Sequence, residues 1–238
     1  MKGTMDNLVV VLGDSLSIQR PWDSIEYKDI YSYKLAKLLG EDFYVINKGR
    51  SANYSTLQID GIQLLQDIIS ESDFYIIQLG VVDCFPRLFT VKEQKIVSMI
   101  KPAFVQKFIT NFASKNRPIL TKLFHKTYVS RKKYRRQYEF LINHIIERTK
   151  AKKIFIINIP DTNEKCANDY YGLRKNIKDY NEILKELVNE YPEKLELVDL
   201  NLLTLNNPDY ILHCGHHVNK EAHEDLANYL NKKIKKNM

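Results

Sequence analysis

The sequence is poor in the features that mark secreted and membrane-spanning proteins. Its 238 residues include only three cysteines, eight glycines and seven prolines. An odd number of irregularly spaced cysteines argues against a disulfide framework and for a reducing compartment, so we expect a cytoplasmic protein. No apolar run approaches the roughly 18 residues that a transmembrane helix needs. The first residues lack the charged and apolar regions of a signal peptide, and internal repeats and low-complexity stretches are absent.

Short apolar segments alternate with helical patterns along the whole chain. The hydrophobic content of 44% and the charged content of 27% are typical of a globular domain with a sizeable core. Apolar runs predict five strands, over 8–12, 43–46, 74–79, 154–159 and 195–198. Apolar residues three and four apart predict helices over 30–39, 57–69, 176–189 and 220–234. Strands separated by helices predict a five-stranded parallel sheet covered on both faces, an α/β protein with a three-layer α/β/α sandwich as a single domain over 1–238.

The interval between the third and fourth predicted strands is too long for one crossover helix. We expect a helical insertion over about 90–152, near the mouth of the site. Between residues 101 and 153 the chain has 15 Lys or Arg and two Glu. Such a patch attracts polyanions, including nucleic acid, anionic lipid headgroups and acidic glycans. The alternative is a solvated face without a partner, and nucleic acid is disfavoured because no nucleic-acid-binding motif accompanies the patch.

Residues 9–16, Val-Val-Val-Leu-Gly-Asp-Ser-Leu, predict a buried strand that ends abruptly in a turn of small residues. The strand fixes the backbone, and Gly13 permits a tight turn. The Ser15 hydroxyl is then left at the carboxyl edge of the sheet, where α/β proteins bind ligands. Ser15 is therefore a candidate nucleophile. The alternative is that Ser15 is simply the N-cap of a helix. Asp14 is expected to accept backbone N–H groups in the turn.

Histidines near the end of the sequence supply a candidate base for this serine. Residues 213–223 read His-Cys-Gly-His-His-Val-Asn-Lys-Glu-Ala-His and precede a helical pattern. Together with Gly-Asp-Ser-Leu at 13–16, this block resembles the GDSL or SGNH hydrolase family of esterases and lipases. The resemblance implies the flavodoxin-like SGNH fold, with Ser15 as nucleophile, His217 as general base and no cofactor.

Two further family blocks have counterparts in the right order, each at a strand end. Asn-Lys-Gly-Arg at 47–50 stands where the family has an oxyanion-hole glycine, so the resemblance assigns the backbone N–H groups of Ser15 and Gly49 to the oxyanion. Gln-Leu-Gly-Val-Val-Asp at 78–83 stands where the family has Gly-x-Asn-Asp. The sequence Val-Val-Asp-Cys-Phe-Pro-Arg at 81–87 resembles the third block of a divergent subset of the superfamily.

The chain departs from the family pattern at two positions. Cys214 stands where the family has its acid, and a neutral thiol cannot hold an imidazole tautomer as a carboxylate does. Val82 stands where the family has an asparagine that donates to the oxyanion, and losing one such donor costs on the order of 3 kcal/mol. Asp209 and Asp83 are candidates for the missing acid, and Asn53 is a candidate for the missing donor.

Several assignments stay open at the level of sequence. His216 competes with His217 for the role of base, because neither has an acidic residue three positions before it. A zinc site formed by Cys214 and neighbouring histidines is conceivable, but its spacing matches no recognised metal pattern, so we expect no metal. Arg50 and Arg87 are candidates for binding a carboxylate or phosphate on a substrate.

These residues predict a serine esterase that acts on small-molecule or glycan O-acyl esters. A short acyl group such as acetyl on a carbohydrate is the favoured substrate, and the reaction would run through an acyl-enzyme formed by a Ser–His dyad or triad. One alternative is an acyltransferase that passes the acyl group to a glycan hydroxyl. Others are a non-catalytic protein of the same fold that binds an acyl-bearing ligand, and a peripheral membrane or polyanion-binding protein.

Overall fold

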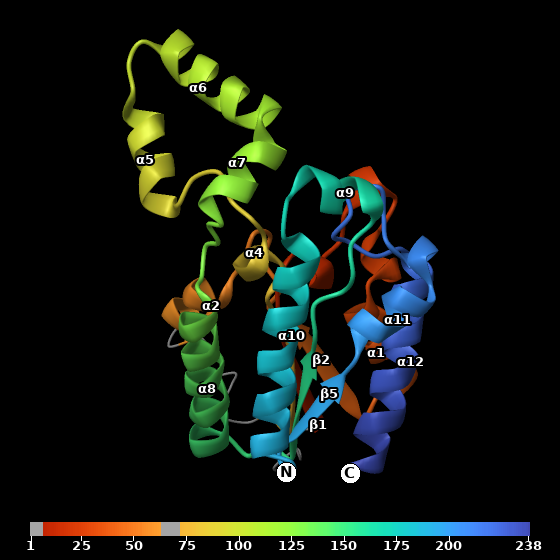
Figure 1. Ribbon diagram of the computed structural model, residues 1–238. Helices are drawn as coiled ribbons and strands as arrows, with labels where there is room; N and C mark the ends of the chain where they lie inside the picture. Colours follow the sequence, from red (N-terminus) through yellow and green to blue (C-terminus); the bar gives the residue numbers. More distant parts are fainter. Residues whose placement is uncertain (1–6, 63–71) are drawn as a thin grey trace.

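A five-stranded parallel sheet forms the centre of the protein (Figure 1). The computed structural model describes residues 7–62 and 72–238. Neighbouring strands pair in parallel, in the order β2-β1-β3-β4-β5. This order is the flavodoxin-like one, which confirms the predicted α/β fold class. The strands are β1 (Asn7–Gly13), β2 (Phe43–Asn47), β3 (Phe74–Gln78), β4 (Lys153–Ile157) and β5 (Leu195–Val198).

Helices cover both faces of this sheet. The five that form the outer layers are α1 (Tyr31–Leu39), α2 (Ser55–Ile62), α8 (Arg131–Arg148), α10 (Leu173–Glu190) and α12 (Lys220–Lys236). On one side α1 packs against α12, and on the other α8 packs between α2 and α10 (Figure 1). Shorter elements connect these strands and helices: η1 (Ser15–Ser17), η2 (Pro21–Asp23), η3 (Tyr27–Asp29), α4 (Val81–Cys84), α9 (Glu164–Asp169), α11 (Leu200–Asn206) and η5 (Pro208–Tyr210).

The predicted periodicities correspond closely to these elements. The helices α1, α10 and α12 confirm the predictions over 30–39, 176–189 and 220–234. The helix predicted over 57–69 is seen as α2, and residues 63–69 of that prediction lie outside the described residues. Continuous apolar runs mark the central strands because both faces of a parallel sheet are covered. Accordingly, the side chains from Val9 to Leu12 in β1 are fully buried.

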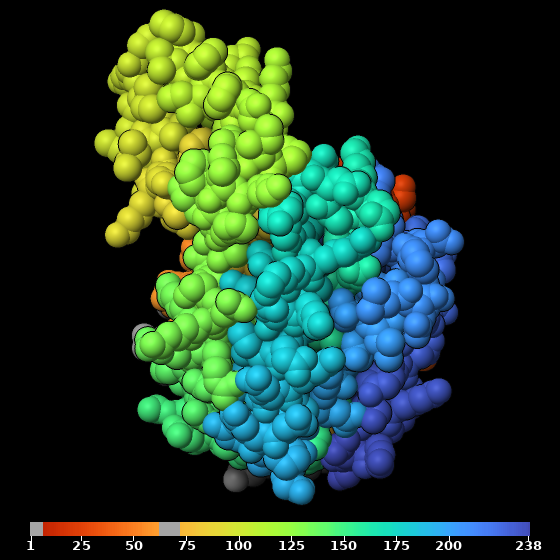
Figure 2. Space-filling view, viewed as in Figure 1, coloured from red at the N-terminus to blue at the C-terminus, as the bar shows by residue number. Residues whose placement is uncertain are grey.

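Part of the chain between β3 and β4 projects from the domain (Figures 1 and 2). We call residues 88–126 the arm; it contains α5 (Val91–Met99), α6 (Ala103–Lys115) and α7 (Arg117–Phe124). Arg87 and Lys126 form an antiparallel bridge at its base. The insertion predicted over 90–152 therefore has two parts, since α8 belongs to the layer over the sheet. Within the described residues, no helix has the length and apolar character needed to cross a bilayer.

The turn after β3 requires a glycine. Gly80 has a φ of +135°, and a Cβ there would lie 2.7 Å from the Ile159 side chain and from the Tyr134 hydroxyl. That hydroxyl donates to the Leu79 carbonyl at 3.1 Å, and Tyr138 donates to the same carbonyl at 2.9 Å. The end of β3 is thus held in place by α8, and the 81–87 segment leaves the sheet from a fixed point.

We expect Gly80→Ala to lower the free energy of unfolding by about 1–3 kcal/mol, because it combines a strained φ with a steric overlap. Urea unfolding measures the change. Gly61→Ala is the matched control, since Gly61 is helical and a Cβ added there would have no heavy atom within 4 Å. That substitution should be neutral or stabilising. Equal stability of Gly80→Ala and the wild type would contradict the steric argument.

Candidate active site

The structure brings Ser15 and His217 into contact across 202 residues of sequence. Ser15 Oγ and His217 Nε2 lie 2.8 Å apart. Ser15 is the first residue of η1, directly after β1, while the N-cap of η1 is Asp14, whose carboxylate accepts from the Leu16 N–H. The alternative reading of Ser15 as a capping residue is therefore wrong, because the preceding aspartate caps the turn. The serine hydroxyl is left to face the imidazole.

His217 is a buried, neutral imidazole. Its side chain is only 4% exposed. Burial, with further contributions from His216, Arg20 and His223, lowers the pKa of His217 from 6.5 to about 2. A neutral ring keeps the lone pair at one nitrogen that a general base needs, here Nε2 facing Ser15. The pair thus has the geometry and the protonation state of a nucleophile and its general base.

A thiol occupies the position at which a carboxylate is expected. Cys214 Sγ lies 3.2 Å from His217 Nδ1. His216, the competing histidine, contacts the same segment differently, because its Nδ1–H donates to the Cys214 carbonyl at 2.8 Å. The Ser15 contact therefore distinguishes His217 from His216, which the sequence pattern alone does not.

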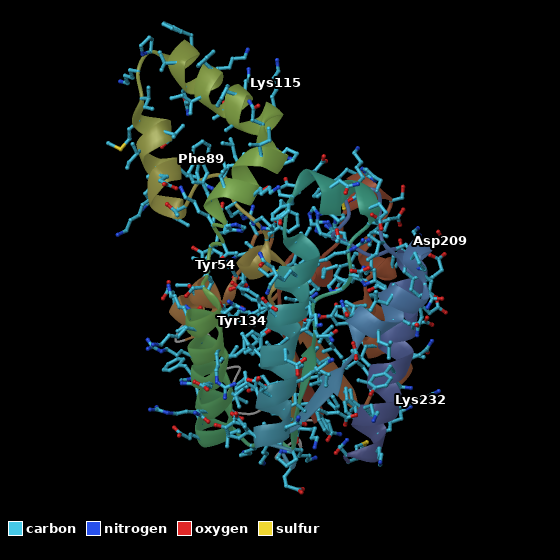
Figure 3. The ribbon with its side chains drawn as sticks, viewed as in Figure 1. Tyr54, Phe89, Lys115, Tyr134, Asp209 and Lys232 are labelled. Carbon is cyan, nitrogen blue, oxygen red and sulfur yellow. The ribbon has the colours of Figure 1, made fainter. Side chains whose placement is uncertain are left out.

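Neither predicted acid reaches the imidazole. Asp83 is fully buried, and its carboxylate accepts from the backbone N–H and the hydroxyl of Ser55. Burial raises the pKa of Asp83 to about 6. Asp209 is an exposed residue of η5 (Figure 3). Its backbone carbonyl accepts from Asn219 Nδ2. Within residues 7–62 and 72–238, the hydrogen bonds of the His217 ring go to Ser15 and Cys214 alone.

Two predicted oxyanion donors are already engaged elsewhere. The Gly49 N–H donates to Asn47 Oδ1 at 2.8 Å. The Asn53 amide is buried, and its Nδ2 donates both to the Gly13 carbonyl at 3.0 Å and to Gln58 Oε1 at 2.9 Å. Both assignments are wrong, because neither group has a hydrogen left to donate to a substrate. Gly49 is needed instead for close packing, since a Cβ there would overlap the Ser17 side chain.

Ala52 is a candidate donor that the sequence analysis does not identify. It has a φ of +53°, and it lines the same cleft as Ser15. In the part of the chain that the structure describes, no acceptor takes the backbone N–H of Ala52 or of Ser15. These two N–H groups are the available donors for an oxyanion. An alanine carries no sequence signal for a left-handed conformation, which glycine or asparagine would have indicated.

A cleft of about 370 Å³ opens beside the Ser15 hydroxyl. Its walls come from six separate segments of the chain, and its lining residues are Ser15, Arg20, Ser51, Ala52, Val81, Val82, Phe85, Arg87, Tyr128, Tyr170, His216 and His217. Val82, which the resemblance placed at the position of an oxyanion-donating asparagine, lines this cleft and has an apolar side chain. The cleft combines aromatic rings with two cationic groups next to the candidate nucleophile.

Of the two predicted substrate-binding arginines, only Arg87 lines the cleft. Its guanidinium lies 4.1 Å from the centre of the Tyr128 ring, and Nη2 donates to the Val82 carbonyl at 3.4 Å. Its buried Nε has no hydrogen-bond partner among the described residues. Burial lowers the pKa of Arg87. Arg50 instead is exposed and donates to Asn53, whereas Arg20, in the cleft, is paired with Asp23 at 2.6 Å.

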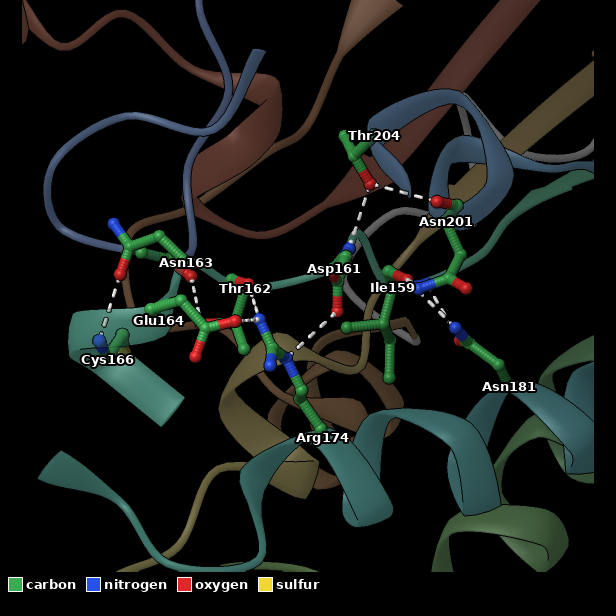
Figure 4. A network of polar contacts seen from close by, with 11 residues as sticks. Ile159, Asp161, Thr162, Asn163, Glu164, Cys166, Arg174, Asn181, Asn201 and Thr204 are labelled. Carbon is green, nitrogen blue, oxygen red and sulfur yellow. Dashed lines mark hydrogen bonds and ion pairs between the residues drawn. The ribbon is translucent and has the colours of Figure 1, made fainter. Parts of the chain in front are cut away.

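The loop that carries the histidines is anchored to the segment after β4, and Figure 4 shows the polar contacts of that segment. The Thr162 hydroxyl donates to the Gly215 carbonyl at 2.6 Å, and Asn163 Nδ2 donates to the carbonyls of Leu212 and His213. Arg174 of α10 in turn donates to the Thr162 carbonyl. The loop that carries His217 is therefore held by side chains from the segment after β4, which α10 holds in turn.

Among the residues that the structure describes, Cys214, His216 and His217 form a group that could hold a metal ion. Their ligand atoms lie within 4.8 Å of one another, and thiolate and imidazole are zinc ligands. The His217 ring is already shared between Ser15 and Cys214. A metal on either nitrogen of that ring would displace one of these contacts, so metal binding and the Ser15–His217 pair are alternatives.

Comparison with solved structures identifies the fold. The M. smegmatis aryl esterase superposes with a TM-score of 0.63 at 13% identity, over 98% of this chain and 100% of that one. A carbohydrate acetylesterase from Sinorhizobium meliloti gives 0.62 at 14%, over 98% and 100%. A catalytic mutant of an acetylxylan esterase from Geobacillus stearothermophilus gives 0.62 at 16%, over 98% and 96%. The chain has the SGNH hydrolase fold. No protein-family model and no curated protein matches the sequence.

Asp14, next to the nucleophile, is a buried acid without a cationic partner. Its Oδ2 and the neighbouring Gln78 Oε1 are both buried without a hydrogen-bond partner in the described chain. Burial raises the pKa of Asp14 from 3.8 to about 7.

We expect Asp14→Asn to gain stability relative to the wild type as the pH rises. Because the pKa of Asp14 is higher in the folded state, folding takes up a proton, and wild-type stability falls as the pH rises from 3.8 through about 7. Asparagine keeps the acceptor for Leu16 and has no proton to lose. Urea unfolding at about pH 5 and about pH 8 measures the difference. A difference that does not change with pH would contradict the assignment.

Proposed function

We propose that the protein is a serine esterase that hydrolyses O-acyl esters, with Ser15 as nucleophile and His217 as general base. The observation that carries the proposal is the 2.8 Å contact between Ser15 Oγ and a neutral His217 Nε2, at the mouth of a cleft. The names of the similar structures, which include an aryl esterase and two carbohydrate-directed esterases, support the same reaction class.

The reaction follows from the positions of these groups. His217 Nε2 takes the hydroxyl proton as Ser15 Oγ attacks the ester carbonyl. The N–H groups of Ser15 and Ala52 donate to the oxygen that becomes negatively charged. His217 then gives its proton to the departing alcohol, which leaves an acyl group on Ser15. A water molecule, deprotonated by the same nitrogen, attacks this acyl-enzyme and regenerates the free serine.

Cys214 is the third member of a Ser15–His217–Cys214 triad. With Nε2 free to accept a proton, the ring proton sits on Nδ1 and is donated to Cys214 Sγ. Sulfur is a weak acceptor, so it orients the imidazole but stabilises the imidazolium less than a carboxylate does. The site therefore works with a neutral positioning group, and its catalytic power is correspondingly modest.

The cleft favours a small acyl group on a polar alcohol. Its volume of about 370 Å³ is at the lower end of the range for ligand pockets. Phe85, Tyr128 and Tyr170 supply apolar faces, and Arg87 supplies hydrogen-bond donors next to them. A sugar presents both C–H faces and hydroxyl groups, so we propose a carbohydrate O-acetyl ester as the substrate class. One of the similar structures is named as a carbohydrate acetylesterase.

We expect Ser15→Ala and His217→Ala each to lower the rate of p-nitrophenyl acetate hydrolysis by about 10⁴-fold or more, because each removes a group that takes part in bond making. His216→Ala is the matched control. His216 lines the cleft without contacting Ser15, so its loss should be much smaller. Thermal unfolding confirms that the variants are folded. Activity retained in Ser15→Ala would refute the mechanism.

We expect Cys214→Asp to raise kcat/KM for the same ester by about ten-fold or more, because a carboxylate stabilises the imidazolium. The carboxylate also raises the pKa of His217 above its value of about 2, so the acid limb of the pH profile moves to higher pH. Cys214→Ser, which adds no charge, should leave the acid limb in place. A folded Cys214→Asp variant with lower activity and an unchanged limb would contradict the role given to Cys214.

A further inference from the structure

The arm exposes an unusual amount of apolar side chain. Nine large apolar residues between positions 91 and 124 are at least 38% exposed, out of nineteen such residues in the described chain. Met99 is 77% exposed, Phe104 is 71% exposed and Phe108 is 70% exposed. Exposed apolar clusters of this kind mark interaction surfaces in monomeric proteins.

These side chains have almost no core of their own to pack into. Among the residues of α5, α6 and α7, only Ala113 and Thr121 are buried. Phe104, Phe108 and Phe112 follow one another at four-residue spacing along α6, so they share one helix face. Phe108 and Phe112 stack with their ring centres 6.5 Å apart and line a groove of about 240 Å³. Apolar side chains are thus exposed to solvent on α5, α6 and α7.

The same arm is strongly basic, and its cations are largely without acidic partners. Residues 88–126 contain eight Lys or Arg and one acid, Glu93. Glu93 pairs with Lys126 at the base of the arm, at 2.6 Å. Within the described residues, no other ion pair involves a cation of the arm. Lys107 and Lys115 on α6 are exposed, and Lys115 is labelled in Figure 3.

The densest basic run in the sequence behaves differently. It lies on α8, where Arg131 pairs with Asp179 and Arg135 pairs with Glu186 and Glu190, all on α10. Part of the charge counted over 101–153 is therefore neutralised within the fold. On the arm, in contrast, unpaired cations lie next to exposed apolar side chains.

We propose that the arm docks the protein onto an anionic lipid bilayer. Interfacial binding combines insertion of aromatic and aliphatic side chains with attraction between lysines and anionic headgroups. The arm offers both on the part of the molecule that projects furthest from the sheet (Figures 1 and 2). A second copy of the chain is the less favoured occupant, because two arms of the same positive charge repel each other.

The test is sedimentation of the full-length protein with vesicles of phosphatidylcholine alone or mixed with phosphatidylglycerol. We expect binding to the mixed vesicles that weakens as salt is added, and little binding to the neutral ones. Replacing three exposed arm lysines by Gln, at Lys95, Lys107 and Lys115, should lower the partition coefficient by about 100-fold, at roughly five-fold for each charge.

The matched charge control removes three exposed cations from α8, by Lys132→Gln, Lys133→Gln and Arg136→Gln. It changes the net charge equally, so it should lower binding far less than the arm variant does. Thermal unfolding of every variant confirms folding without reference to any enzymatic activity. The test is therefore independent of the proposed esterase function.

The apolar contribution is tested by Phe104→Ser combined with Leu123→Ser, which should weaken binding even where salt screens the charges. Leu202→Ser with Leu205→Ser on α11 is the control, because both leucines are 52% exposed away from the arm. Three results would overturn the proposal. They are no binding of the wild type to mixed vesicles at low salt, equal loss in the α8 control, and a dimer in solution that Phe104→Ser with Leu123→Ser dissociates.

Discussion

The pairing of β1 with β3 is the constraint on which the site depends. The register places Gly13 beside Gln78, the last residue of β3, and the Asp14 N–H then donates to the Gln78 carbonyl at 3.1 Å. Both strands therefore end at the same level. The turn that carries Ser15 and the segment that begins at Gly80 leave the sheet side by side, which is why one cleft can draw on both. A slip in register would separate them.

The sequence was sufficient to predict the fold and the candidate serine, because these depend on patterns along the chain, but the choice of His217 over His216 needed the Ser15 contact in the structure. Apolar runs and helical periodicity are local, and Ser15 follows directly from the strand before it. The predicted roles of Gly49 and Asn53 failed for a different reason. Whether an N–H is free depends on which acceptor lies near it in space, here Asn47 and Gln58. Ala52 was missed because its φ of +53° leaves no mark in the residue type.

The basic residues also show that a local pattern can be read from the sequence while the pairing of charges in space cannot. A count along 101–153 correctly finds a basic segment, but it treats α8 and the arm alike. Only the structure shows that α10 supplies the acids that pair with α8. Similarly, the sequence shows that Cys214 replaces an acid, but not whether another carboxylate takes its place. The structure answers this, because it places Cys214 Sγ itself 3.2 Å from His217 Nδ1.

The bridge between Arg87 and Lys126 has a consequence for the evolution of the domain. It brings the two ends of a 39-residue excursion together in antiparallel pairing, which is the geometry that a tight hairpin closes. Arg87 also contributes to the cleft wall, as does Tyr128 just beyond the bridge. The arm is thus an insertion whose two ends are joined by the Arg87–Lys126 bridge. Its helices can be exchanged or shortened to a turn while the cleft keeps its wall, so recognition and chemistry can diversify separately.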